Sequence, residues 1–196
     1  MSTVTVDEYY RATMQLLASE GFKGVTIAAL GRTLGVTSGS FYHHFGSLDG
    51  FLEQFLERWE AQETQRIIDL TRSHGEPSER LGVLIALATE VPHSAEAALR
   101  AWANTSGTVR RAQDRIDDRR LAFLDEVLKP LVVDPEERRI VAGLTFSSFV
   151  GVQQLQDHLG PELTRGILRE VERAIAAPRP ASARVVAKRR ASGGRA

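Results

Sequence analysis

The stretch of sequence that decides the fold is TIAALGRTLGVTSGSFYHHF, residues 26–45. Two leucines one helical turn apart precede Gly35, and Phe41 and Phe45 repeat that spacing after it. Glycine readily adopts the positive φ that a tight helix-ending turn requires. Two short helices with inward apolar positions and a glycine-containing turn between them are typical of a helix-turn-helix. The sequence therefore predicts this motif in residues 26–45.

The second of these helices, residues 37–45, has a polar outer face. At about 100° per residue, the direction opposite Phe41 and Phe45 falls between Gly39 and His43. Hydroxyls, imidazoles and a bare backbone at this face suit hydrogen bonds to phosphate oxygens and base edges in a major groove. The free N–H groups at the start of the helix can also meet a phosphate. The DNA-binding residues that we expect are Thr26, Thr37, Ser38, Gly39, Ser40, Tyr42, His43 and His44.

Several of these residues also fit a role without DNA. Tyr42 is compatible with an ordinary tyrosine at the edge of a core, and Thr26 with a simple helix cap. His43 and His44 could be a pair of metal ligands, but adjacent helical positions point about 100° apart and no nearby Cys, Asp or Glu completes a site. We therefore expect no metal.

The remainder of the chain predicts helices as well. Thr5 and Glu8 form a capping box at the start of a first helix, which ends at Gly21. Ser47 can cap a long fourth helix that runs to about Ser73. Further helices are expected over residues 78–91, 94–104, 108–130, 135–158 and 161–176. Alternating β-branched segments are missing, so the predicted fold class is all-α.

Composition narrows the possible functions. The 196 residues contain no cysteine, which excludes disulfides, thiol catalysis and thiolate metal sites. No apolar run approaches the roughly 18 residues of a membrane-spanning helix, and the N-terminus lacks a signal-peptide core. No nucleophile–base pair, carboxylate constellation or phosphate loop is evident. We therefore expect a cytoplasmic protein that is not an enzyme, with no cofactor and no membrane partner.

The net charge of zero conceals an asymmetry along the chain. Residues 178–196 carry six basic residues and no acidic one, which leaves 19 basic against 25 acidic residues in the rest. A basic tail on an acidic body fits an interaction arm. A disordered, solubilising end fits as well, because the tail has no aromatic residue to stack on bases.

The ordered residues TIAALGRTLGVTSGSFYHHFGSLDGFL, residues 26–52, resemble the DNA-binding region of the TetR family of transcriptional regulators. The resemblance covers roughly the first 55 residues. It implies a helix-turn-helix domain over residues 1–46, a ligand-binding and dimerisation domain over residues 47–177, and a tail over residues 178–196. Ser38 and Leu48 stand where the family often has a basic residue, so two phosphate contacts are missing.

The resemblance implies a repressor that binds a near-palindromic DNA operator as a homodimer and is released by a small-molecule effector. Two alternatives remain open. One is an activator or a ligand-independent regulator of the same fold. The other is a helical ligand-binding protein with a vestigial helix-turn-helix, which the few basic residues in residues 1–46 would favour.

The family's effector pocket lies among the middle helices. The aromatic residues that we expect in its walls, each of which also fits a simple core position, are Trp59, Trp102, Phe123, Phe146 and Phe149. The mixed-charge run in residues 110–120 fits a solvated helix face with i, i+4 pairs. The fourth helix is the only expected element that spans both domains, so we expect it to transmit the signal.

The last two helices are the expected dimer surface, although a core helix within one subunit also fits. Apolar and small residues recur there at helical spacing, namely Ala142, Phe146, Phe149 and Gln153 beside Gly143, Ser147 and Val150. Small residues allow two helices to approach closely, and a symmetric four-helix contact between two subunits would cover this surface.

Overall fold

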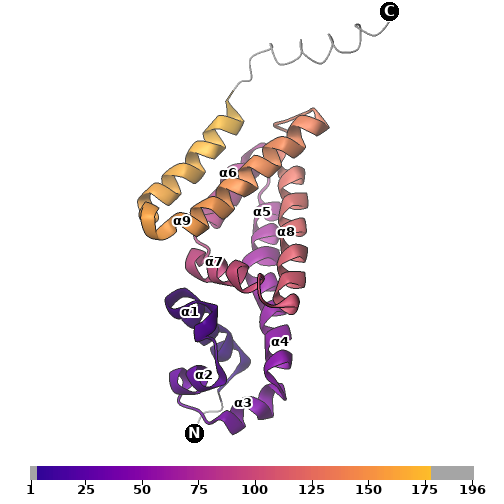
Figure 1. Ribbon diagram of the computed structural model, residues 1–196. Helices are drawn as coiled ribbons and strands as arrows, with labels where there is room; N and C mark the ends of the chain where they lie inside the picture. Colours follow the sequence, from indigo (N-terminus) through magenta and orange to yellow (C-terminus); the bar gives the residue numbers. More distant parts are fainter. Residues whose placement is uncertain (1–3, 178–196) are drawn as a thin grey trace, which may run out of the picture.

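The computed structural model describes residues 4–177, and helices without any strand build this part of the chain. A small unit at one end contains α1 (Val6–Glu20), the short η1 (Phe22–Gly24), α2 (Ile27–Leu34) and α3 (Ser38–Phe45). The larger body contains α4 (Leu48–Glu60), η2 (Ala61–Gln65), α5 (Arg66–Ser73), η3 (Pro77–Glu79), α6 (Arg80–Ala88), α7 (His93–Trp102), α8 (Gly107–Leu128) and α9 (Pro135–Ala176). In Figure 1 α4 lies beside the small unit, and the later helices of the body lie above it. The prediction of an all-α fold is confirmed. The basic arm expected in residues 178–196 lies outside the described residues.

The turn between α2 and α3 forms as the sequence predicts. Gly35 ends α2 in the left-handed conformation, with φ 67° and ψ 31°. Gly31 is needed for a different reason, because a Cβ there would lie 2.9 Å from the carbonyl oxygen of Val36. Thr37 then begins α3 by accepting a hydrogen bond from the backbone N–H of Ser40 at 3.4 Å. The two short helices are thereby fixed at the angle of a helix-turn-helix.

The fourth predicted helix is continuous but not uniform. Between α4 and α5, the residues Ala61–Gln65 form a π-helical turn, which we call the wide turn. Such turns hold one residue more than an α-helical turn and often lie at functional sites. Helical periodicity gives no sign of this change in the sequence. The wide turn places two carbonyls in reach of arginines: that of Gln62 accepts from Arg66, and that of Glu63 accepts from Arg120.

The last helix, α9, is folded back on itself at Gly160. This residue has φ 70° and ψ 167°, outside any helical conformation, and Pro161 follows it. Figure 1 shows the two arms of α9 meeting in a hairpin at this point. The break predicted between residues 158 and 161 is therefore present.

Two clusters of buried apolar side chains hold the helices together. The first joins the helix-turn-helix unit to α4, α7 and part of α8, and includes Tyr9, Phe51, Trp59, Leu99 and Ile116. The second lies among α5, α6, α8 and α9, and includes Ile68, Ile85, Phe123, Leu128 and Leu168. The core thus continues across residue 46, where we expected a domain boundary. The helix-turn-helix unit is packed on the body rather than held by α4 alone.

Within residues 4–177, no helix combines the length and the apolar character that crossing a membrane requires.

Candidate nucleic-acid interface and internal cavity

Aromatic packing fixes the orientation of α3. Phe41 and Phe45 are almost fully buried, and their ring centroids lie 5.9 Å and 5.0 Å from that of Tyr9 on α1. Phe51 at the start of α4 closes the group, 5.2 Å from Phe41. The rings meet edge-on or tilted, arrangements that aromatic pairs favour. Burying a phenylalanine side chain stabilises a fold by roughly 1.5–3 kcal/mol, so α3 has little freedom to turn about its axis.

The opposite face of α3 is open to solvent. Ser38, Gly39, Tyr42 and His43 are exposed, and Tyr42 retains 50% of its accessible surface. His44 differs from them because it is partly buried and its ring lies 5.8 Å from that of Tyr9. The face that is free to meet DNA is therefore narrower than the sequence suggested.

The threonines among the expected DNA-binding residues begin their helices. Thr26 accepts a hydrogen bond from the backbone N–H of Ala29 at 3.1 Å, and Thr37 caps α3 as described. Ser40 is only partly exposed. All the backbone and side-chain groups on the open face of α3 are free of permanent charge, since serine, glycine, tyrosine and histidine make it up.

A partly open cavity of about 80 Å³ lies among the wide turn, α5, α6, α8 and α9. Its walls are mostly apolar: Ile67, Ile68, Leu84, Ile85, Ala88, Val91, Phe123, Leu124, Phe146, Phe149 and Leu168. A single water needs about 10–15 Å³ by the same measure, so several heavy atoms fit. Three further residues, Glu63, Thr64 and Arg120, form what we call the polar end of the cavity.

Three of the five aromatic residues expected in the pocket line this cavity, namely Phe123, Phe146 and Phe149. The two tryptophans lie elsewhere. Trp59 is fully buried in the first cluster, where its indole N–H donates to Glu96 at 2.8 Å. Trp102 at the end of α7 stacks on Phe22 of η1, with 6.0 Å between the ring centroids. Both rings are used in packing between the helix-turn-helix unit and the body.

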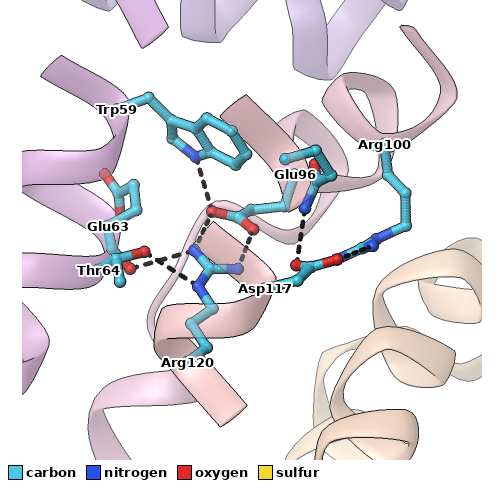
Figure 2. A network of polar contacts seen from close by, with 8 residues as sticks. Trp59, Glu63, Thr64, Glu96, Arg100, Asp117 and Arg120 are labelled. Carbon is cyan, nitrogen blue, oxygen red and sulfur yellow. Dashed lines mark hydrogen bonds and ion pairs between the residues drawn. The ribbon is translucent and has the colours of Figure 1, made fainter. Parts of the chain in front are cut away.

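A buried ion pair lies beside the polar end of the cavity. The guanidinium of Arg120 makes two hydrogen bonds to the carboxylate of Glu96, at 2.7 Å and 2.9 Å. The side chains are 11% and 1% exposed. Figure 2 shows this guanidinium between Glu96 on one side and the wide turn with Glu63 and Thr64 on the other. Arg120 therefore connects α8 to α7 and to the wide turn.

Burial alone would raise the pKa of Glu96, because it disfavours the charged form. The charge of Arg120, and the hydrogen bonds from Arg120 and Trp59, outweigh burial and hold the pKa of Glu96 below its ordinary value. Glu96 is thus an ionised carboxylate that joins α4, α7 and α8.

A hydrogen bond joins the polar end of the cavity to the helix-turn-helix unit. The hydroxyl of Tyr10 on α1 donates to Oε1 of Glu63 at 3.2 Å. Burial and the nearby charge of Glu96 raise the pKa of Glu63, and Tyr10 and two arginines only partly offset them. One carboxylate therefore faces the cavity and also contacts the domain that carries α3.

Further contacts join the helix-turn-helix unit to the body, and α7 to α8. α1 lies along α7, and Arg58 of α4 forms an ion pair with Asp7 of α1. On α7, Arg100 makes a bidentate pair with Asp117 of α8, at 2.7 Å and 2.9 Å. The fourth helix is therefore not the only contact between the two domains, because α7 also packs on α1.

The outward face of α9 carries a row of exposed apolar side chains. Ile140 and Leu144 retain 66% of their surface each, and Leu155 and Leu163 retain just over half. The residues expected at a dimer contact divide between two faces. Ala142 and Gln153 are buried, and Phe146 and Phe149 line the cavity, whereas Ser147 is exposed. The inward-facing set forms core within the subunit, so these residues are not free to contact a second copy.

Sequence reasoning missed Arg120 because it lies in the mixed-charge run that we assigned to solvent. A signal was present, since Arg120 is four residues after Ile116 and three before Phe123, on the buried stripe of α8. Glu96 likewise lies between buried Ala95 and Leu99 on α7. Charged residues on an apolar stripe are the pattern that predicts a buried pair.

A helix-turn-helix with an open polar face, packed on an all-helical body, indicates a DNA-binding regulator. Residues 10–55 match the family model described as bacterial regulatory proteins, tetR family. The DNA-binding region of the chain, residues 10–55, is thus similar to that of the TetR family.

Named relatives agree with this assignment over the N-terminal part. The chain is 40% identical over 70 residues to the HTH-type transcriptional repressor NemR of Escherichia coli K12, which is 36% of this chain and 35% of that protein. It is 31% identical over 91 residues to the repressor KstR2 of Mycolicibacterium smegmatis, 44% of this chain and 43% of that protein. These alignments thus span less than half the length of the relatives they match.

The fold is similar over nearly the whole chain. A transcriptional regulator from Rhodococcus sp. Rha1 superimposes with a TM-score of 0.74 at 18% identity, covering 90% of this chain and all of that one. At this identity the likeness concerns the fold. It shows that the described helices are arranged as in solved regulators.

Proposed function

We propose that the protein is a transcriptional repressor that binds a near-palindromic operator as a homodimer and is released by a small molecule. The observation that carries this proposal is α3 itself. Its apolar face is locked into an aromatic core, and its opposite face presents hydroxyls, ring edges and bare backbone to solvent. Such groups suit the phosphates and base edges of a major groove.

The exposed apolar row on α9 supports a homodimer. Ile140, Leu144 and Leu155 lie within about 60° of one another around the first arm of α9, at about 100° per residue, and Leu163 is exposed on the second arm. A second copy of the chain would cover them. We therefore assign the dimer contact to these exposed residues, in place of Ala142, Phe146, Phe149 and Gln153, which face the inside of the subunit. A dimer places two copies of α3 about one turn of DNA or a multiple apart, as a near-palindromic operator requires.

The cavity supports an effector site. A ligand shifts a conformational equilibrium only when it binds the two conformers with different affinity. A ligand at the polar end of the cavity would reach contacts that position the helix-turn-helix unit, because Glu63 contacts α1 and Arg120 contacts α7 and the wide turn. A ligand that displaces either contact would favour a different position of the helix-turn-helix unit.

Electrophoretic mobility shift on DNA from the protein's own promoter region tests the proposal. We expect specific binding by the wild type and its loss in Tyr42→Ala, because Tyr42 is half exposed on the open face of α3. His74→Ala, an exposed change at the end of α5, is the matched control and should bind normally. Specific binding that survives in Tyr42→Ala, or none at any salt concentration, would contradict the proposal. Transcript levels in a deletion strain separate a repressor from an activator.

A further inference from the structure

Most of the hydrogen-bonding groups at the polar end of the cavity already have partners. Four of the five N–H groups of Arg120 are used: two by the carboxylate of Glu96, one by the hydroxyl of Thr64 and one by the carbonyl of Glu63. The hydroxyl of Thr145, the other polar group in the wall, donates to Val141 at 2.7 Å. Arg120 therefore has little capacity left for a ligand, whereas the hydroxyl of Thr64 can still donate and that of Thr145 can still accept.

Glu63 has the largest unused hydrogen-bonding capacity among the described residues that line the cavity. A carboxylate accepts about four hydrogen bonds, and that of Glu63 accepts one, from Tyr10 to Oε1. The Arg120 contact to this residue uses the backbone carbonyl instead. Its Oε2 accepts no hydrogen bond from the described residues. The unsatisfied group at this cavity is thus an acceptor.

The net charge beside the polar end of the cavity is negative, which favours a positively charged donor as well. Glu63 and Glu96 are both acidic and Arg120 pairs closely with Glu96, so one negative charge remains beside the cavity. Arg66, the other basic residue near Glu63, is exposed on the outer side of the helix. Burial and the charge of Glu96 both act against ionised Glu63, and a positive charge in the cavity would offset both.

The rest of the cavity wall suits a ligand that has a cationic group and an apolar hydrocarbon part. Phe123, Phe146 and Phe149 are aromatic, and the guanidinium of Arg120 lies 5.8 Å from the centroid of Phe149. The faces of aromatic rings attract cations, and this attraction strengthens where water is excluded. The apolar remainder of the wall favours a hydrocarbon body.

We propose that the effector is a small amphipathic cation, with an apolar body among the aromatic walls of the cavity and a protonated amine paired with Glu63. The inference rests on the proposed function and assigns its effector a chemical class. An amine paired with the free Oε2 of Glu63 neutralises the carboxylate, which weakens the hydrogen bond that its Oε1 accepts from the hydroxyl of Tyr10. Binding therefore loosens the contact between α1 and the wide turn, and with it the position of α3.

Three probes with the same six-carbon chain test the class: hexylammonium, hexan-1-ol and hexanoate. Calorimetric titration of the full chain at neutral pH measures the affinity of each. We expect hexylammonium to bind about tenfold or more tightly than hexanoate, because a hydrogen bond to a charged partner contributes about 1.5–3 kcal/mol. Equal or tighter binding of hexanoate overturns the proposal, and so does a lack of binding by all three probes.

Two variants should change the affinity for hexylammonium in opposite directions. Glu63→Gln keeps the shape and removes the charge, so it should lower that affinity about tenfold while hexan-1-ol binds as before. Tyr10→Phe removes the hydrogen bond that already stabilises the carboxylate and leaves its charge to the amine, so it should raise the affinity. Thermal unfolding of each variant shows whether it is folded. An unchanged hexylammonium affinity in folded Glu63→Gln overturns the proposal.

The same probes added to the operator shift assay separate this inference from the proposed function. Hexylammonium that binds with dependence on Glu63 supports the effector class even if the chain binds no operator. Specific operator binding by a chain that does not bind hexylammonium contradicts the proposed effector class. The proposed function as a repressor would then still stand.

Discussion

The open face of α3 and the polar end of the cavity distribute charge in opposite ways. The face expected to meet a polyanion has no permanent charge, whereas the interior holds an arginine and two glutamates. Charges at a surface act mainly through screened, long-range attraction. Charges in the interior act at short range and depend strongly on geometry. The molecule thus has its strongest electrostatic interactions where helices are joined, and uses shape and neutral hydrogen-bonding groups where we expect it to read DNA.

The largest effect is expected from breaking the interior pair. Arg120→Met leaves the fully buried Glu96 without its partner, and losing one member of a buried pair costs about 3–5 kcal/mol. Urea unfolding followed by circular dichroism measures the loss. Arg173→Met, at an exposed pair with Glu170, is the matched control and should change the free energy of unfolding by less than about 0.5 kcal/mol. Similar losses in the two variants would remove the contrast between interior and surface.

The two faces of α3 should separate stability from DNA binding. Phe41→Ala removes a ring that is 2% exposed and should cost about 3–5 kcal/mol of stability. Tyr42→Ala, one residue further on, should cost less than about 0.5 kcal/mol while operator affinity falls. Unfolding curves and shift assays on the same preparations give both quantities. If Tyr42→Ala destabilised the fold as much as Phe41→Ala does, its loss of binding would say nothing about DNA contact.

The salt dependence of binding tests whether α3 works without charge. The slope of log affinity against log salt should be shallow in the wild type, since few cations neutralise phosphates. Ser38→Arg places a charge at the exposed first residue of α3 and should steepen the slope by about one. Fluorescence anisotropy over a series of salt concentrations measures it. A wild-type slope as steep as that of proteins with many Lys or Arg contacts would show that charges elsewhere, including residues 178–196, dominate.

The smallest effect concerns the pH dependence of stability at Glu63. Its folded pKa is raised above the unfolded value by burial and by Glu96, against Tyr10, Arg66 and Arg120. A raised pKa means that the protonated carboxyl favours folding, and this contribution is lost as the pH rises through the folded value. Relative to the wild type, Glu63→Gln should therefore gain in Tm as the pH increases from about 4.3, the ordinary glutamate value. A Tm difference that stayed constant between acidic and neutral pH would contradict the raised pKa.

Much of the fold could be predicted because local rules decide it. The capping box at Thr5, the left-handed Gly35 and the break at Gly160 each follow from the conformational preferences of single residues. The outer face of α3 follows from helical geometry alone. These features need no knowledge of which helix packs against which.

The rest depends on tertiary packing. The burial of Arg120 requires α7 to bring Glu96 opposite it, and helical periodicity does not specify the neighbour of a stripe. For the same reason Trp59 and Trp102 could be predicted to be buried but not to lie outside the cavity. On α9 the division between core and exposed face is decided by the neighbours that pack against it, which are α6, α7 and α8. The link from Tyr10 to Glu63 joins residues 53 positions apart, which no local pattern encodes.

The wide turn sets the rotational phase of the two ends of one long helix. Trp59 and Ile67 are both buried, on either side of it. In a regular α-helix, eight residues would leave these side chains about 80° apart around the axis, at roughly 100° per residue. A turn that holds one extra residue reduces that angle to about 20°. Removing one residue from Ala61–Gln65 would therefore give a regular helix without rotating the helix-turn-helix unit. A deletion of one residue in the wide turn can thus be tolerated by the packing on either side of it, although it changes which polar groups face the cavity.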